Sequence, residues 1–298
     1  MEKIRKIDIH AHSVLNGQYE LPSHTGLSPE DLITLYDELG VEKGILLPIT
    51  SPEGTACVMS NGNTKAITTM YPGRLLWACN VDPRLGRNSP DTDLSEYLEF
   101  YKSLGAVSMG ELTANIYADD PMMENLFSCC EECDMAVTIH IAPKKGGYGI
   151  IDDLGLPRLE KMLKRHPKLK IFGHSQPFWA EISSDCSEEN RGFFPKGKVT
   201  EGRIAHLLRD YPNLYCDLSA YSGFNALSRD IDYTLGFIEE FWPRIMYGID
   251  ACTVNDRHIR PMASFLDSLY EKGDISEEAY RGICRENAER ILKLDRFL

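Results

Sequence analysis

Short apolar runs alternate with longer amphipathic segments along almost the whole chain. The runs are rich in Val, Ile and Leu, and most are apolar at consecutive positions rather than at alternate ones. Parallel strands that are buried between an inner core and an outer layer of helices have this composition. Eight runs are therefore predicted as strands, at residues 6–12, 43–49, 74–81, 106–112, 136–142, 170–175, 214–220 and 244–251.

The segments between these runs carry the start and stop signals of helices. In residues 28–40, Ser28 is the expected N-cap, Pro29 occupies the first turn, and Gly40 lies beyond the last turn. The same signals predict further helices at residues 95–105, 120–134, 156–167, 200–212 and 276–294.

Strict alternation of eight strands with helices predicts an α/β protein whose residues 1–298 form a single-domain (β/α)8 TIM barrel. An open doubly wound sheet is the alternative fold. No G-x-G-x-x-G motif follows the first strand to favour it. In a barrel of this kind the active site lies at the carboxyl ends of the strands, so polar residues there carry the most functional information.

Composition and charge indicate which kinds of binding partner this protein can have. The chain has 298 residues, of which 43% are hydrophobic and 26% charged, as is usual for a soluble globular protein. The formal net charge of −13 is spread along the chain and argues against nucleic-acid binding, which needs clustered Lys and Arg. No apolar run approaches the ~20 residues that cross a bilayer, and "MEKIRK" leads into a strand. We therefore expect no membrane association and a cytoplasmic location.

The cysteines predict reduced thiols. There are nine of them, an odd number, without the regular spacing of a disulfide framework. Cys130 and Cys133 form a C-x-x-C, but no second pair follows them, so helix packing is the expected role.

The first predicted strand ends in two histidines, within "KIDIHAHSV". Residues two apart in a strand project to the same face, so Asp8, His10 and His12 are expected to share one face. Two imidazoles beside a carboxylate make half of a metal site. A polar patch at the end of a strand is the alternative.

Chelating side chains recur at the ends of other predicted strands. Glu111 ends the fourth strand, His140 the fifth, His174 the sixth and Asp250 the eighth. Burying such groups is unfavourable unless each has a partner, and one divalent cation satisfies several at once. The other four histidines are expected to be structural or superficial: His24, His166, His206 and His258.

Together these motifs resemble the amidohydrolase superfamily, and more closely its amidohydrolase-2 branch of metal-dependent hydrolases and non-oxidative decarboxylases. The resemblance rests on "DIHAH", "TIHIA", "FGHS" and "YGIDA" in this order, and on "ENAERIL" in the last helix, so it spans nearly the whole chain. The ordered set is specific for the superfamily and poorly specific for the substrate.

The resemblance implies a divalent metal, with zinc as the first choice and manganese or iron as alternatives. Asp250 would be both a ligand and the carboxylate that handles protons. His174 would bind a second metal, or orient the substrate carbonyl or the attacking water, and Asp8 would support the ligands from behind. The implied ligands are His10, His12, Glu111, His140, His174 and Asp250.

The number of ions stays open at one or two. Several superfamily members bridge two metals with a carbamylated lysine on the fourth strand, whereas "AVSMGEL" has no lysine. Glu111 resembles the glutamate that other members use at the comparable strand end, and a carboxylate can bridge two cations.

Two reactions fit this ring of residues. In hydrolysis, a divalent ion lowers the pKa of a bound water to roughly 7, the resulting nucleophile attacks an amide, ester or lactone carbonyl, and Asp250 passes the proton to the leaving group. In non-oxidative decarboxylation of a small aromatic or unsaturated acid, Asp250 would instead protonate the carbon that loses CO2. That reaction usually needs an arginine for the carboxylate, and the candidates are Arg84, Arg87, Arg229 and Arg257.

A barrel that binds metal without catalysis is a third hypothesis, against which the complete ligand ring argues. A serine hydrolase is disfavoured because Pro177 replaces the last glycine of a G-x-S-x-G elbow around Ser175.

Two loops are expected to set specificity for a small-molecule substrate. The candidate substrate-binding residues follow the sixth and seventh strands: Gln176, Trp179, Tyr221, Asn225 and Arg229. Cap and loop packing is the alternative role for them. Residues 182–200 are long and polar enough for a lid. Whether the chain forms a homo-oligomer stays open.

Overall fold

The eight predicted strands are present and run parallel to one another. The structure is a computed structural model, which describes residues 3–15, 26–54 and 59–297; His24 lies outside these residues. A two-residue strand, β6 (Ile150–Ile151), is added beside the fifth predicted strand. The eight are β1 (Lys6–Ala11), β2 (Val41–Leu46), β3 (Leu75–Trp77), β4 (Met109–Leu112), β5 (Val137–Ala142), β7 (Ile171–His174), β8 (Leu214–Asp217) and β9 (Ile245–Met246).

The strands close into a barrel through two seams. One sheet contains β1, β2 and β3, and the other contains β4, β5, β7, β8 and β9. A parallel bridge between Cys79 and Met109 joins β3 to β4. At the other seam, the backbone N–H of Ile9 donates to the carbonyl of Tyr247 at 3.1 Å, and that of Asp250 to the carbonyl of His10 at 2.8 Å. The (β/α)8 TIM barrel expected from the alternation is confirmed, and the open sheet is excluded.

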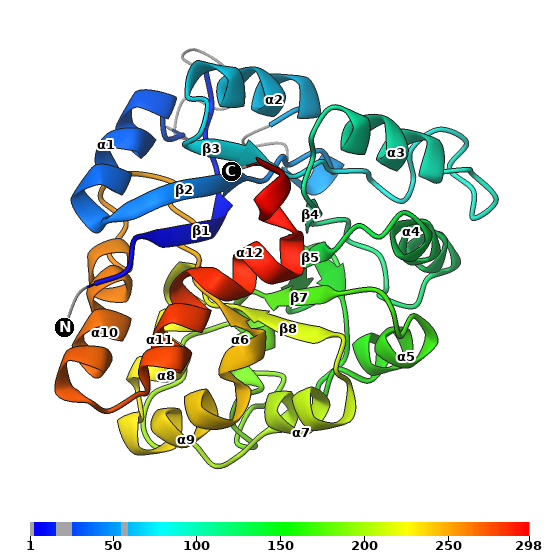
Figure 1. The fold of residues 1–298 in the computed structure, drawn as a ribbon. Coiled ribbons are helices and arrows are strands. Elements are labelled where there is room, and N and C mark those ends of the chain that lie inside the picture. Colours follow the sequence, from blue (N-terminus) through cyan, green and yellow to red (C-terminus); the bar gives the residue numbers. More distant parts are fainter. Residues whose placement is uncertain (1–2, 16–25, 55–58, 298) are drawn as a thin grey trace.

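Helices surround the strands in Figure 1. The first one begins as predicted, since the backbone N–H of Asp31 donates to Ser28 Oγ at 3.1 Å and Gly40 ends the helix with φ 72°. The helices are α1 (Pro29–Leu39), α2 (Asn61–Met70), α3 (Ser95–Ser103), α4 (Pro121–Glu132), α5 (Pro157–Arg165), α6 (Gln176–Ala180), α7 (Arg203–Asp210), α8 (Ala220–Ser228), α9 (Ile231–Phe241), α10 (Ile259–Lys272), α11 (Glu277–Arg281) and α12 (Asn287–Leu292).

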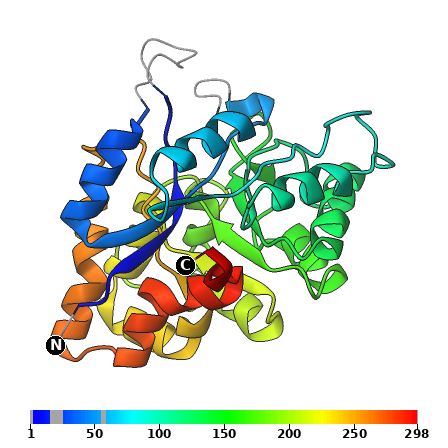
Figure 2. The ribbon, with the colours of Figure 1, turned by 45° about the horizontal axis from the view of Figure 1, so that its top comes forward.

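The C-terminal segment closes one end of the barrel. It was predicted as one helix over 276–294, but a π-helical turn at Gly282–Glu286 separates α11 from α12. Both ribbon views show this red segment lying across the ring of strands (Figures 1 and 2). Apolar side chains from α12 join an inner core with residues from opposite strands: Ile7, Ile9, Ile45, Phe172, Met246, Ala288, Ile291 and Leu292. The open end of the barrel is therefore the one at which the strands have their carboxyl ends.

The predicted alternation along β1 breaks before its histidines. The pairing of β1 with β2 shifts register between Asp8 and Ala11. The Asp8 carboxylate accepts a hydrogen bond from Tyr36 of the outer helix α1 at 2.7 Å, and it accepts from the backbone N–H of His10 at 2.9 Å. Asp8 thus supports the backbone of His10 rather than either imidazole, and the expectation that it shares their face is wrong because of this bulge.

The C-x-x-C pair belongs to the packing of α4. Burial raises the pKa of the Cys133 thiol to about 12, and it raises that of Cys130 well above its ordinary range. Buried thiols held in the neutral form are poor ligands and poor nucleophiles. Within the described segments, none of the helices combines the length and the apolar character that a bilayer span requires.

Candidate metal centre

Two buried imidazoles at the end of β1 point their Nε2 atoms at the same space. The Nε2 atoms of His10 and His12 lie 3.1 Å apart. His10 Nδ1 lies 2.6 Å from Asp217 Oδ2, and His12 Nδ1 lies 2.9 Å from the carbonyl of Leu47. A ring that donates its Nδ1–H to an oxygen keeps the lone pair of Nε2 free for a metal. Their oxygen partners therefore prepare both rings as ligands.

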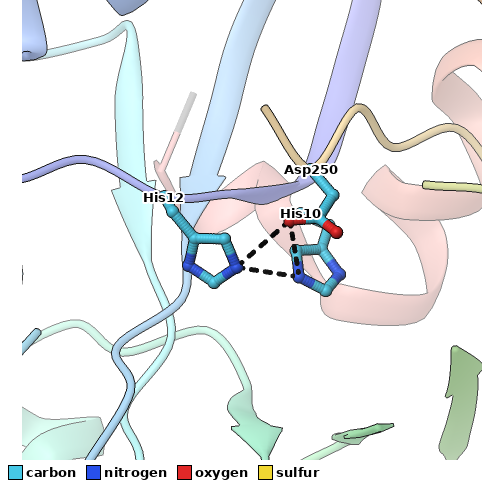
Figure 3. Close-up of side chains that lie close together, drawn as sticks. All are labelled: His10, His12 and Asp250. Atoms are coloured by element: carbon cyan, nitrogen blue, oxygen red, sulfur yellow. Dashed lines mark hydrogen bonds and ion pairs between the residues drawn. The ribbon is translucent and has the colours of Figure 1, made fainter. Parts of the chain in front are cut away.

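Asp250 faces these rings from the loop after β9, as Figure 3 shows. Its Oδ1 lies 3.4 Å from His12 Nε2 and 3.8 Å from His10 Nε2. Its Oδ2 lies 3.6 Å from Nε2 of His174. The backbone of Asp250 has φ 52°, a left-handed conformation that non-glycine residues adopt at some expense and that clusters at functional sites. In this conformation the Asp250 carboxylate points towards the histidines at the open end of the barrel.

Glu111, at the end of β4, completes the opposite side of the cluster. Its Oε2 lies 3.7 Å from His12 Nε2, and its Oε1 lies 3.9 Å from His174 Nε2. The Tyr148 hydroxyl donates to Oε2 at 2.9 Å. On the far side of the His174 ring, Nδ1 lies 2.9 Å from Ser219 Oγ. Tyr148 thus holds Glu111 in place, and Ser219 holds His174.

Two sets of side chains have ligand atoms close enough to hold a metal ion. In each set the atoms lie within 4.8 Å of one another: His10, His12 and Asp250 form one set, and His10, Glu111 and His174 form the other. Imidazole nitrogens with carboxylate oxygens suit zinc, manganese and iron alike. The residues present therefore fit a divalent cation.

His140, the predicted ligand on β5, lies at the edge of this cluster and outside both sets. Its ring centroid is 5.5 Å from that of His174 and 4.9 Å from that of Tyr148. Its Nδ1 is buried and has no hydrogen-bond partner among the described residues. Burial lowers the pKa of His140 to about 4, so the ring is neutral at neutral pH, as a metal ligand must be. Its role as a ligand stays a prediction that the buried, unpaired nitrogen supports.

The cluster concentrates negative charge. Burial by itself raises the pKa values of Glu111, Asp217 and Asp250, but the surrounding histidines outweigh it and hold all three below their usual range. Burial lowers the pKa of His10, yet the charges of Asp217 and Asp250 raise it to about 10. Three buried carboxylates thus form a negative environment that a divalent cation would complement, in place of the proton that they favour on metal-free His10.

Sequence reasoning missed Asp217, Tyr148 and Ser219. Asp217 is the last residue of β8, so it carries the same signal as the other strand-end residues, and the rule that selected Glu111 applies equally to it. The indole N–H of Trp179 donates to the backbone carbonyl of Asp217 at 2.9 Å. Tyr148 and Ser219 lie outside the strands, where only the folded backbone brings them to the cluster.

Most of the predicted substrate-binding residues gather beside the cluster rather than in it. Gln176, Trp179, Asn225 and Arg229 line one small cavity between α6 and α8. Tyr221 does not line the cavity, but its ring packs against Phe194, which does, and the Arg257 guanidinium lies 3.9 Å from its ring centroid. Residues 182–200, the predicted lid, are anchored by the bridge of Ser183 to Glu201 and by the fully buried Arg191, which donates to the carbonyl of Asp152 at 3.0 Å.

Of the predicted arginines, none makes a hydrogen bond or ion pair to the cluster within the described part of the chain. Arg84 donates to both carboxylate oxygens of Glu53 and to Asp82, and Arg87 is exposed. Three of the remaining histidines have structural or surface positions: His166 is buried against Phe127, His206 pairs with Glu201, and His258 lies 2.8 Å from the carbonyl of Ile249.

Comparison with known proteins gives a family match and several structural neighbours. A family model described as amidohydrolase matches residues 7–294. A probable 2-pyrone-4,6-dicarboxylic acid hydrolase from Acinetobacter baumannii is 13% identical with a TM-score of 0.64, covering 97% of this chain and 100% of that one. A 2,6-dihydroxybenzoate decarboxylase from Rhizobium is 16% identical with a TM-score of 0.63, covering 99% and 100%. A dihydroxybenzoic acid decarboxylase from Polaromonas sp. JS666, solved with bound manganese, is 18% identical with a TM-score of 0.60, covering 99% and 98%. A search of curated proteins finds no match.

Proposed function

Because this chain belongs to the amidohydrolase family, we propose that it is a metal-dependent hydrolase that adds water to an amide, ester or lactone carbonyl of a small organic substrate. The observation that carries the proposal is the convergence of five side chains at the open end of the barrel: His10, His12, Glu111, His174 and Asp250. They come from strands far apart in the sequence and meet within ion-pair distance, which a purely structural polar patch does not require.

The two sets of ligand atoms would hold the metal, with His140 beside them. The bound ion, for which we propose zinc first and manganese or iron as alternatives, would supply a Lewis acid that polarises the carbonyl and lowers the pKa of water. Whether one ion or two bind depends on Glu111, whose two oxygens face His12 and His174 separately.

Asp250 is placed to move the proton. Its side chain is 17% exposed, whereas those of His10, His12 and His174 are 5% exposed or less. Of these four side chains it is therefore the one that water and substrate reach most easily. As an ionised carboxylate it accepts the proton of the attacking water and then delivers it to the leaving group. His174, held from behind by Ser219, orients the substrate carbonyl or that water.

Decarboxylation is the second candidate, and the decarboxylases among the structural neighbours favour it. In that reaction Asp250 would protonate the carbon from which CO2 departs. It would also need a cationic side chain beside the metal to hold the substrate carboxylate. Arg84 is already saturated by Glu53 and Asp82, and Arg229 lies in the cavity beyond Trp179. Arg257 is exposed with its guanidinium 3.9 Å from the Tyr221 ring centroid, and Arg87 is exposed. The positions of Arg84 and Arg229 favour hydrolysis.

A substrate screen on the metal-loaded protein tests the proposal. Lactones, aryl esters, anilides and hydroxybenzoates are incubated with protein reconstituted separately with zinc and manganese, and acid production and CO2 release are followed in parallel. We expect hydrolysis without CO2 release, abolished in Asp250→Asn and retained in Asp256→Asn, a control in the same loop. Release of CO2 would replace the hydrolase with the decarboxylase. Absence of any turnover with a fully loaded centre would favour the non-catalytic metal-binding barrel.

A further inference from the structure

A small cavity lies one side chain away from the metal cluster, between α6 and α8 and beneath residues 193–195. Trp179 separates the two, because it lines the cavity while its indole N–H donates to the Asp217 carbonyl at 2.9 Å. Asp217 in turn holds His10. The cavity has room for little more than one water-sized group.

The guanidinium of Arg229 faces this cavity without a partner. Its Nε and both Nη atoms are buried, and none has a hydrogen-bond partner among the described residues. Asp230 does not serve it, because its carboxylate accepts from the Lys198 ammonium at 3.0 Å and from the backbone N–H of Val199 at 2.8 Å. Asp185 is exposed and forms no ion pair with it. A guanidinium carries five N–H donors and cannot shed its charge, so burying it unpaired is unfavourable.

Ser222 presents a second unused donor to the same cavity. It is 4% exposed, and its buried Oγ has no hydrogen-bond partner in the described part of the chain. Residues 222 and 229 are two turns apart on α8 and its end, so they share one face. Of the other polar residues that line the cavity, Asn225 donates its amide N–H to the carbonyl of Pro195 at 2.9 Å, and Gln176 adds a neutral amide. The cavity thus combines one fixed positive charge and a hydroxyl with no carboxylate.

We propose that this cavity binds a small anion, a halide ion or a single carboxylate group, held by Arg229 and Ser222. Charge-assisted hydrogen bonds from a guanidinium to an anion are among the strongest in proteins, and a fork of N–H groups matches a carboxylate. The proposal does not depend on which reaction the metal centre performs. The anion has two sources: a free ion from solution, or an acidic arm of the substrate that reaches past Trp179.

Bromide is the direct probe. Crystals of the full chain soaked in sodium bromide should show an anomalous difference peak within hydrogen-bond distance of the Arg229 guanidinium. In solution, sodium bromide and sodium formate should raise the melting temperature of the wild-type protein in a saturable manner. Arg229→Met should lose this response, weakening the apparent formate affinity roughly tenfold or more. It should also melt no lower than wild type in a buffer without small anions, because the unpaired charge is gone.

Two further variants keep the test decisive. Arg281→Met removes an exposed arginine of α11 that pairs with Glu286, and it should respond to bromide as the wild type does. If Arg229→Met fails to fold, Ser222→Ala should still weaken the response several-fold. No anomalous peak, with equal responses in wild type, Arg229→Met and Arg281→Met, would overturn the proposal. Once a substrate is known, formate that raises its KM indicates the acidic arm, and formate without kinetic effect indicates the free ion.

Discussion

Replacing Asp217 with asparagine isolates what the buried carboxylate behind His10 contributes to the metal centre. The two oxygens of Asp217 have separate duties: Oδ2 accepts from His10 Nδ1 at 2.6 Å, and Oδ1 accepts from the backbone N–H of Ser219 at 2.9 Å. Asparagine offers one acceptor oxygen for these two donors. If the oxygen stays with Ser219, the amide N–H2 faces His10 and favours the tautomer that carries its proton on Nε2. That tautomer cannot bind a metal through Nε2.

The magnitude follows from this conflict. Turning the amide instead leaves the Ser219 N–H as a buried, unmet donor, which costs about 1–3 kcal/mol. Losing a carboxylate behind a metal-binding histidine typically lowers metal affinity about 10- to 100-fold, which is about 1.4–2.7 kcal/mol. The cost of the unmet Ser219 N–H and the loss of metal affinity therefore agree in magnitude. We therefore expect Asp217→Asn to bind zinc or manganese about 10- to 100-fold more weakly than the wild type.

The assay is a competition titration of chelator-treated protein against a chromophoric chelator at constant pH and ionic strength. Asp152→Asn is the matched control, because Asp152 is 3% exposed and both of its oxygens also accept backbone N–H groups, from Arg158 and Leu159. It has no contact with either set of ligands. Equal metal affinities for Asp217→Asn and the wild type, with both proteins folded, would refute the reasoning.

The remaining predictions concern the residues around Glu111 and His140. Tyr148→Phe deletes the 2.9 Å hydrogen bond to Glu111 and should lower metal affinity about three- to tenfold in the same titration, whereas an unchanged affinity would show that Glu111 is held by other means. In metal-free protein, His140 is protonated more readily in the unfolded chain, near its ordinary pKa of 6.5, than in the native state, where burial lowers its pKa to about 4. Keeping His140 neutral therefore costs no unfolding free energy above pH 6.5 and costs more as the pH falls from 6.5 towards 4, in total roughly 3 kcal/mol. In urea titrations at several pH values, His140→Gln should lose less unfolding free energy than the wild type over this range, by this amount. Gly149→Ala should destabilise the protein by more than about 2 kcal/mol in urea, because Gly149 has φ +116° and an added Cβ would lie 2.5 Å from the His140 carbonyl oxygen; a wild-type urea midpoint would contradict the packing described for this turn.

The barrel could be predicted because its strands are buried on both faces. Continuous apolar runs of this length, separated by capped amphipathic segments, leave few alternatives to a parallel sheet between helices. The candidate ligands were predictable for a geometric reason, since the carboxyl ends of the strands all meet at one end of a closed barrel. For this reason His174 lies within ion-pair distance of both Glu111 and Asp250, and Asp250 lies within that distance of His12.

The parts that were not predicted depend on backbone irregularities and on loops. The register shift between Asp8 and Ala11 turns the Asp8 carboxylate towards Tyr36. A sequence pattern in which side chains alternate strictly between the two faces of a strand does not predict such a bulge. Tyr148 reaches Glu111 from the turn after β5, a contact between residues 37 positions apart that requires the folded loop. Arg229 likewise has no hydrogen-bond partner among the described residues, and this follows only from the fold, in which Asp230, its neighbour in sequence, pairs with other groups.

The most direct measurement of the central claim is the position of the metal itself. Crystals of protein reconstituted with manganese or zinc, measured on both sides of the absorption edge, should show an anomalous peak about 2.0–2.3 Å from the Nε2 atoms of His10 and His12 and from a carboxylate oxygen of Asp250. A second peak between Glu111 and His174 would indicate a binuclear centre. Stoichiometric metal bound elsewhere, or no metal after reconstitution of folded protein, would contradict the account.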